Sequence, residues 1–319
     1  MTSLVSRISA APGAFDPERG DEAAAQLGAG GALADLLHGA AGSSPFLASL
    51  IGKEADWLAA AVQMAPEDAM TDLIAGLETD DRAADIALRE AKRRAALLIA
   101  LCDLGGVWAL EEVTGALSDF ADAATRRAFD VAMTGERTGP LAGLSAQEAG
   151  LVILAMGKGG ARELNYSSDI DLILLFEDER FEDLDEVRPR FTKIAQRAVK
   201  LLSEHTGAGY VFRTDLRLRP NPSVTSPCMP ISVAERYYES VGRTWERSAF
   251  IKARVVGGDL EAGRQFLDGM TPFIWRRHLD FAALEDINDI RAKIRDAKGL
   301  AGLRDLPGYN LKLGPGGIR

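Results

Sequence analysis

Two aspartates one residue apart, Asp169 and Asp171, lie at the start of an apolar segment, 170–176. Because side chains on a strand alternate between its two faces, both carboxylates emerge on the same side, with their Cα atoms about 7 Å apart. Two carboxylates at that separation repel each other unless a cation lies between them. Mg²⁺ prefers oxygen ligands and typically binds one or two carboxylates together with substrate phosphates. The spacing therefore predicts a magnesium site with Asp169 and Asp171 as ligands.

A third carboxylate, Asp215, lies in a segment, 207–220, in which charged and apolar residues alternate. Two-metal phosphoryl chemistry needs such an acid on a neighbouring strand, because metals about 3.5–4 Å apart must share ligands. Arg213, Arg217 and Arg219 have the same parity as Asp215. Guanidinium groups match phosphate geometry. We expect 207–220 to be a strand with one charged face, on which Arg217 and Arg219 bind either phosphate or a carboxylate network.

The residues before the aspartate pair have the composition of a phosphate-binding turn. Gly157 and Gly160 allow the backbone to approach a phosphate closely, while Lys158, Ser167 and Ser168 add a cation and two hydroxyl donors. The segment matches neither the Walker motif nor the dinucleotide fingerprint. It predicts a phosphate cradle in front of the metal site, and the alternative is a tight turn with exposed aspartates.

A second group of cations lies in "GRTWERSAFIKAR", residues 242–254, which we expect to be helical. Its charged residues could form ion pairs within an amphipathic helix, each worth only tenths of a kcal/mol. They could also face a phosphate, and Lys252 and Arg254 are then the favoured contacts. The chain has only three histidines, and we expect His205 and His278 to be structural.

These residues need a scaffold, and the apolar pattern predicts a small α/β unit. Two apolar segments, 150–156 and 170–176, indicate buried strands on either side of the glycine turn. The segment 185–205 has apolar residues on one helical face, and the alternating segment 207–220 follows it. We expect this nucleotidyltransferase core to span 135–257.

Helical regions are predicted on both sides of the core. Residues 22–134 are rich in Ala and Leu, with helix-length amphipathic segments separated by breakers, which predicts a helical region over 1–134. A second helical region is predicted over 258–319. Further helices are expected at 231–256, 259–278 and 280–298. The predicted fold class is α+β, a predominantly helical chain with a small sheet unit.

Composition limits the partners of the chain. The net charge of −10 over 319 residues argues against general affinity for nucleic acid, which needs a basic face. Cys102 and Cys228 lie far apart without a pairing pattern, which suits a reducing cytoplasm. The apolar run 95–101 is far shorter than the roughly 20 residues of a membrane span. We expect a cytoplasmic protein that binds neither nucleic acid nor membrane.

Four longer motifs carry a family resemblance. The chain resembles the bifunctional glutamine synthetase adenylyltransferase/adenylyl-removing enzymes, which belong to the polymerase-β-like nucleotidyltransferase superfamily. The motifs span about residues 150–319 and read "AMGKGGARELNYSSDIDLILLF", "VFRTDLRLRPNP", "YYESVGRTWERSAFIKARVVGGD" and "NLKLGPGGIR".

The resemblance implies a specific reaction. Family members have two homologous nucleotidyltransferase halves joined by a regulatory helical region. "ARELNYSSDIDLI" together with "NLKLGPGGIR" is similar to the N-terminal half, which removes AMP from the adenylylated tyrosine of glutamine synthetase. Inorganic phosphate is then the attacking group, ADP is released and the tyrosine hydroxyl is restored. The resemblance further implies that the chain is a fragment, and that the full-length enzyme responds to a PII-type signalling protein.

The resemblance also assigns site residues. Asp169, Asp171 and Asp215 match the metal-binding catalytic carboxylates of the family. The nucleotide-side loop is matched by Gly157, Lys158, Gly160, Ser167 and Ser168. Two other functions stay open: transfer of AMP from ATP to the tyrosine, and a regulatory docking module without catalysis. Three converging aspartates argue against the docking module, because a module without turnover does not need them.

Overall fold

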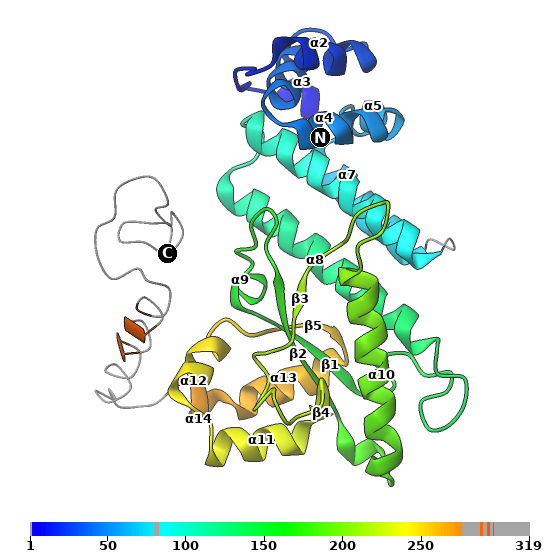
Figure 1. The fold of residues 1–319 in the computed structure, drawn as a ribbon, viewed down its shortest axis with the longest axis vertical. Coiled ribbons are helices and arrows are strands. Elements are labelled where there is room, and N and C mark those ends of the chain that lie inside the picture. Colours follow the sequence, from blue (N-terminus) through cyan, green and yellow to red (C-terminus); the bar gives the residue numbers. More distant parts are fainter. Residues whose placement is uncertain (1, 80–82, 276–287, 290–291, 294–295, 297–319) are drawn as a thin grey trace.

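The structure is a computed structural model in which residues 2–79, 83–275, 288–289, 292–293 and 296 are described. It consists of helices packed around a small mixed sheet, as Figure 1 shows. The predicted α+β class with a mostly helical chain is confirmed. Within the described ranges, no helix combines the length and the apolar character that crossing a membrane requires.

Helices occupy the first part of the chain, as the Ala- and Leu-rich pattern predicts. Pro17 and Pro45 begin two of them, where the carboxylate of Asp16 or the hydroxyl of Ser44 accepts a backbone N–H of the first turn. The helices are α1 (Leu4–Arg7), α2 (Pro17–Gln26), α3 (Ala32–Ser43), α4 (Pro45–Lys53), α5 (Ala55–Ala61), α6 (Pro66–Thr79), α7 (Ala84–Leu104) and α8 (Leu110–Met133). The two long helices α7 and α8 lie side by side (Figure 1).

The sheet has five described strands with mixed directions. They are β1 (Leu151–Met156), β2 (Ile170–Phe176), β3 (Thr214–Asp215), β4 (Cys228–Pro230) and β5 (Arg254–Gly258). The order is β3-β2-β1-β5, and β4 also pairs with β2. β1 is antiparallel to β2 and to β5, whereas β2 is parallel to β3 and β4. The two central strands begin within one residue of their predicted positions.

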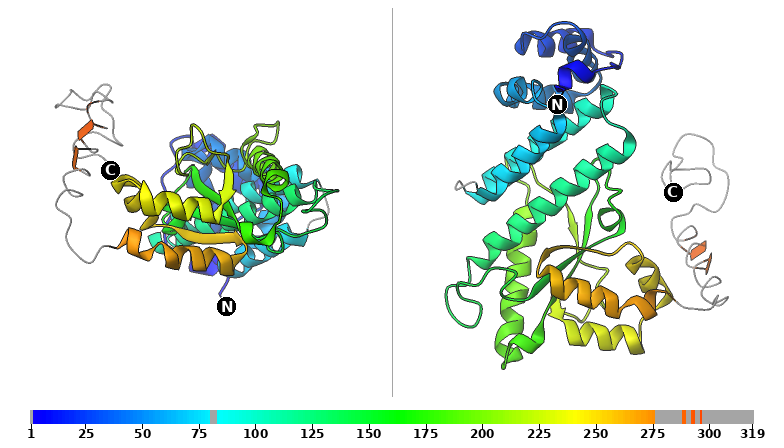
Figure 2. Two further views of the ribbon diagram at one scale, coloured as in Figure 1. Left: turned by 90° about the horizontal axis from the view of Figure 1, so that it is seen from below. Right: turned by 180° about the vertical axis from the view of Figure 1, so that it is seen from behind.

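Alternate residues of β1 and β2 enter two different cores, so both faces of the sheet are covered. Ile153 and Leu174 belong to the core shared with α8 and α10 (Leu184–Ser203). Leu154 and Ile173 belong to a second core that contains aromatic side chains of the later helices. The view from behind in Figure 2 shows α8 crossing the sheet on the first side.

The remaining helices follow the sheet strands along the chain. A four-residue helix, α9 (Gly157–Gly160), follows β1 directly, and a 3₁₀ turn (Asp178–Arg180) follows β2. The helix predicted over 185–205 is α10. The later helices are α11 (Ile231–Ser240), α12 (Thr244–Phe250), α13 (Leu260–Gly269) and α14 (Thr271–Ile274). Figure 1 shows α11 and α13 on the side of the sheet away from α8.

The predicted strand over 207–220 is wrong except at β3. The Asp215 carboxylate accepts the backbone N–H of Arg217 at 2.8 Å, which turns the chain and ends the strand. The segment beyond it contains Pro220 and Pro222, which cannot donate to a sheet ladder. The four charged residues of equal parity therefore do not share one strand face.

The predicted helix over 231–256 is also wrong as a single element. It is divided into α11 and α12, and its end is the strand β5. The division lies at Gly242, where an added Cβ would lie 2.7 Å from the Tyr238 carbonyl oxygen. His278, most of the predicted helix 280–298 and the motif at 310–319 lie outside the described residues.

Candidate active site

The parallel pairing of β2 with β3 brings two of the predicted carboxylates next to each other. Asp171 and Asp215 are register partners, as are Ile170 and Thr214. Asp169 lies immediately before β2, two residues from Asp171. The structure thus places Asp215 on the strand beside Asp171, where a shared metal site requires it.

Arginines hold the two outer carboxylates. Arg213 donates from Nε to Asp169, and its other nitrogens donate to the Ser167 carbonyl at 2.6 Å and the Tyr210 hydroxyl at 3.1 Å. Arg217 donates to both carboxylate oxygens of Asp215 at 2.5–3.0 Å. These hydrogen bonds from Arg217 lower the pKa of Asp215, so its carboxylate is charged at neutral pH.

The donor set fits Mg²⁺ chemically. Three carboxylates at the ends of two paired strands supply the oxygen ligands that this ion prefers. Among the described residues no three acidic, histidine or cysteine side chains are arranged around one point, because Asp169 and Asp215 turn toward arginines. Gly157 leaves space beside the third acid, since a Cβ there would lie 2.8 Å from Asp171 Oδ2. Metal binding would require the arginines to release their partners.

The glycine turn is compact and lies against the aspartates. Gly157 has a φ of 56°, a conformation that favours glycine, and begins α9 directly after β1. Gly160 is approached closely by the chain itself, because the Lys252 carbonyl oxygen would lie 1.7 Å from an added Cβ. Lys158 lies within α9, and its side chain has no ion-pair partner among the described residues.

The two serines lie between the glycine turn and Asp169. Ser167 has a φ of 56° and offers its carbonyl to Arg213. The Ser168 hydroxyl donates to the Asn165 side chain, and its backbone N–H donates to the Asn165 carbonyl at 3.2 Å. Both serines therefore belong to the turn that positions Asp169.

Besides Arg217, three more of the predicted phosphate-binding cations already donate to protein acceptors. Arg219 donates to backbone carbonyls of its own loop at 2.7–3.1 Å, and burial lowers its pKa. Lys252 pairs with Glu163 at 2.5 Å. Arg254 donates to Asp122 at 2.6 and 3.1 Å and to the carbonyls of the glycine turn. The structure does not gather these cations around the aspartates.

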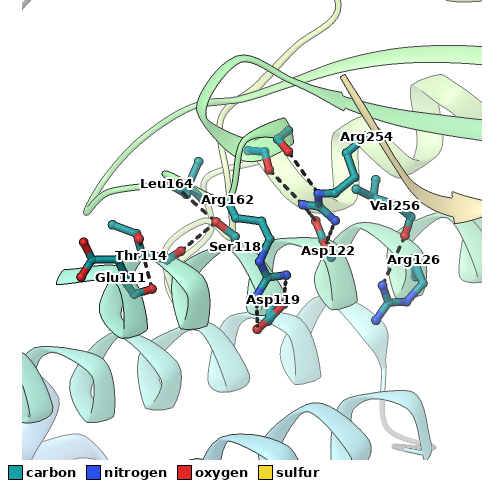
Figure 3. Close-up of polar contacts among 12 residues, drawn as sticks. Glu111, Thr114, Ser118, Asp119, Asp122, Arg126, Arg162, Leu164, Arg254 and Val256 are labelled. Carbon is teal, nitrogen blue, oxygen red and sulfur yellow. Dashed lines mark hydrogen bonds and ion pairs between the residues drawn. The ribbon is translucent and has the colours of Figure 1, made fainter. Parts of the chain in front are cut away.

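Helix α8 supports the glycine turn through side chains that the sequence reasoning missed (Figure 3). Ser118 accepts the Leu164 backbone N–H at 3.4 Å. One residue later, Asp119 binds Arg162 at 2.6 and 2.9 Å, where Arg162 has a φ of 59°. These contacts fix the chain between the glycine turn and the serines.

The next turn of α8 supports β5. Asp122 is buried and binds Arg254, whose guanidinium also donates to the carbonyls of Gly159 at 2.9 Å and Gly160 at 3.2 Å. Arg126 donates to the Val256 carbonyl at 3.3 Å (Figure 3). In the sequence, only the position of Asp122 on the apolar face of an amphipathic helix could have indicated this contact. Helix α8, strand β5 and the glycine turn therefore form one hydrogen-bonded unit.

We expect Asp122→Asn to lower the free energy of unfolding by about 2–3 kcal/mol, because it leaves the partly buried Arg254 without its counter-charge. Burial raises the pKa of Asp122, and Arg254 opposes that effect. Asp119→Asn is the matched control on the same helix. Its pair is exposed, with 47% exposure on each side, and it should cost less than about 1 kcal/mol. Urea unfolding measures both, and equal losses would contradict the buried role of Asp122.

Comparison with known proteins shows the family. The family model described as glutamate-ammonia ligase adenylyltransferase matches residues 33–269. The chain is 40% identical to a bifunctional glutamine synthetase adenylyltransferase/adenylyl-removing enzyme of Rhodopseudomonas palustris, covering 100% of this chain and 35% of the relative. Enzymes with the same description from Bradyrhizobium sp. (strain ORS 278) and Caulobacter vibrioides are 43% and 41% identical, covering 91% and 100% of this chain.

The chain spans about a third of the length of these relatives, since it covers 31% and 34% of the last two. The match extends over the helices α3 to α8, the sheet and the later helices up to α13, so it includes the glycine turn and all three aspartates. The family resemblance of the motifs is thereby confirmed, and the chain belongs to the glutamate-ammonia ligase adenylyltransferase family.

Proposed function

We propose that the chain removes AMP from the adenylylated tyrosine of glutamine synthetase by phosphorolysis. The observation that carries this proposal is the pairing of Asp171 with Asp215 on adjacent strands, with Asp169 two residues away and the glycine turn beside them. The relatives are named for both attaching and removing AMP. The direction rests on the motif "ARELNYSSDIDLI", which is similar to the removing half.

The reaction needs positioning and charge neutralisation more than proton transfer. An oxygen of inorganic phosphate forms a bond to the phosphorus of AMP, the bond from that phosphorus to the tyrosine oxygen breaks, and the tyrosine oxygen takes up a proton. The products are ADP and tyrosine. Because the attacking phosphate already carries negative charge, the site has little need of a strong general base.

Each part of the site has a role in this reaction. Asp169, Asp171 and Asp215 would hold Mg²⁺, which supplies positive charge at the phosphate of AMP. Lys158 and the backbone of the glycine turn would bind phosphate oxygens. Arg217 holds Asp215 in the structure and would turn to phosphate once a metal takes that carboxylate.

The deciding experiment measures ADP release from adenylylated glutamine synthetase with Mg²⁺, with and without inorganic phosphate. Phosphate-dependent ADP release that disappears in Asp169→Asn supports the proposal. AMP incorporation from ATP without phosphate-dependent release would show the attaching reaction instead. Binding of glutamine synthetase without either reaction would show a docking module. Regulation by a PII-type signalling protein is an expectation for the full-length enzyme only.

A further inference from the structure

A cavity of about 840 Å³ lies where α4 and α7 meet the segments 166–168 and 206–212. This volume lies within the range of small-molecule sites, about 300–1,000 Å³. Its apolar wall includes Leu47, Leu50 and Val211. None of the predicted metal-ligating aspartates lines the described part of the cavity, but Ser167 and Ser168, which directly precede Asp169, do.

Lys92 reaches this cavity from α7. Its Nζ lies 3.9 Å from the centroid of the Phe212 ring and 5.7 Å from that of Phe120. Among the described residues it has no carboxylate partner. Burial lowers the pKa of Lys92 to about 8, so the amine is mostly charged at neutral pH. A cation held against apolar surface without an acid is a favourable partner for an anion.

The other ionisable groups of the lining either have a partner or are exposed. Arg93 donates to Glu54 at 2.6 Å, and Tyr166 donates to Asp103 at 3.0 Å. Lys53 lines the cavity from α4, where it is exposed. Lys92 is thus the half-buried cation of this lining that lacks a counter-charge among the described residues.

We propose that this cavity binds a small organic anion with an apolar or aromatic body, whose anionic group pairs with Lys92. The apolar wall receives the body of the ligand, and Ser167 and Ser168 line the same space. The proposal does not depend on the proposed deadenylylation. The cavity nevertheless has Tyr210 in its lining, and that hydroxyl accepts a hydrogen bond from the arginine that holds Asp169.

The test compares two fluorescent probes with similar bodies, 8-anilinonaphthalene-1-sulfonate and the uncharged N-phenyl-1-naphthylamine. We expect saturable binding of the sulfonate to the chain. Lys92→Met should weaken that binding about tenfold, as expected for the loss of one charge-assisted contact, and leave the uncharged probe unchanged. Lys200→Met, at a position whose side chain is 70% exposed, is the matched control and should alter neither.

A second variant keeps the test decisive if Lys92→Met is poorly folded. Ala96→Trp places a large side chain in the cavity lining and should reduce the binding of both probes. Circular dichroism and thermal unfolding check that each variant is folded. Equal affinity of the sulfonate probe for wild type and folded Lys92→Met, or no effect of Ala96→Trp on either probe, would overturn the proposal. Neither measurement requires catalysis, so failure here is distinct from failure of the proposed function.

Discussion

Asp171→Asn is expected to lower ADP release by about a thousandfold while the chain stays folded. The substitution keeps the size of the side chain and the strand pairing of β2, but it removes a charged oxygen ligand beside Asp215. It also relieves repulsion between two neighbouring acids, so the free energy of unfolding should change by less than about 1 kcal/mol.

The measurement is phosphate-dependent ADP release at saturating Mg²⁺, together with thermal unfolding of the same preparation. Asp268→Asn, at an exposed position of α13, is the control for a general effect of removing one negative charge. It should retain full activity. An unchanged rate in Asp171→Asn would remove the metal site from the mechanism, whereas a loss of both activity and folding would show that Asp171 is structural.

The sequence pattern was sufficient to predict that Asp171 and Asp215 lie on neighbouring strands, but not that arginines hold Asp169 and Asp215. An apolar run bounded by glycines predicts a buried strand, and the two central strands were found within one residue of their expected starts. Period-two alternation places Asp169 and Asp171 on one side of such a strand. The need for a third ligand then indicates Asp215, which the register pairs with Asp171. The alternation pattern of the strands and the need for a third carboxylate thus indicate the same residues.

The prediction that the arginines share one strand face with Asp215 was wrong, because it assumed that the strand continues through all of these residues. The Asp215 side chain accepts the backbone N–H of Arg217, and the chain turns after two paired residues. Arg219 then satisfies the carbonyls of that loop. A side chain that hydrogen-bonds to nearby backbone competes with the hydrogen bonds of the sheet. The alternation of charged residues alone does not show which of the two forms.

The contribution of α8 could not be predicted because its partners are far away in the sequence. Asp122 and Arg254 are separated by 132 positions. Taken alone, Asp122 is one acidic residue among several on an amphipathic helix, and its burial is visible only once β5 is in place. Since the predicted helix 231–256 extended over the first three residues of β5, the pairing of β5 with α8 could not be inferred. A wrong assignment of one element, here β5, thus also hides the contacts that another element, here α8, makes with it.

Gly160→Ala is expected to lower the free energy of unfolding by about 3 kcal/mol or more. The added Cβ would lie 1.7 Å from the Lys252 carbonyl oxygen and 2.5 Å from the Ala155 carbonyl oxygen. Both contacts are with backbone, so removing the clash requires β1 and the segment just before β5 to move away from α9. The same movement would break the hydrogen bond from Arg254 to the Gly160 carbonyl.

Gly159→Ala is the matched control, one residue earlier in the same short helix. Its added Cβ would meet only the Ala155 Cβ at 3.8 Å, which is an ordinary contact. Alanine also loses less backbone entropy than glycine on entering a helix, so this variant should be neutral or more stable by up to about 1 kcal/mol. Urea unfolding of both variants measures the difference. If Gly160→Ala proved as stable as Gly159→Ala, the close packing of the glycine turn against the Lys252 carbonyl would be wrong. A large difference would show that Gly160 is needed for the close approach of the Lys252 carbonyl to the glycine turn.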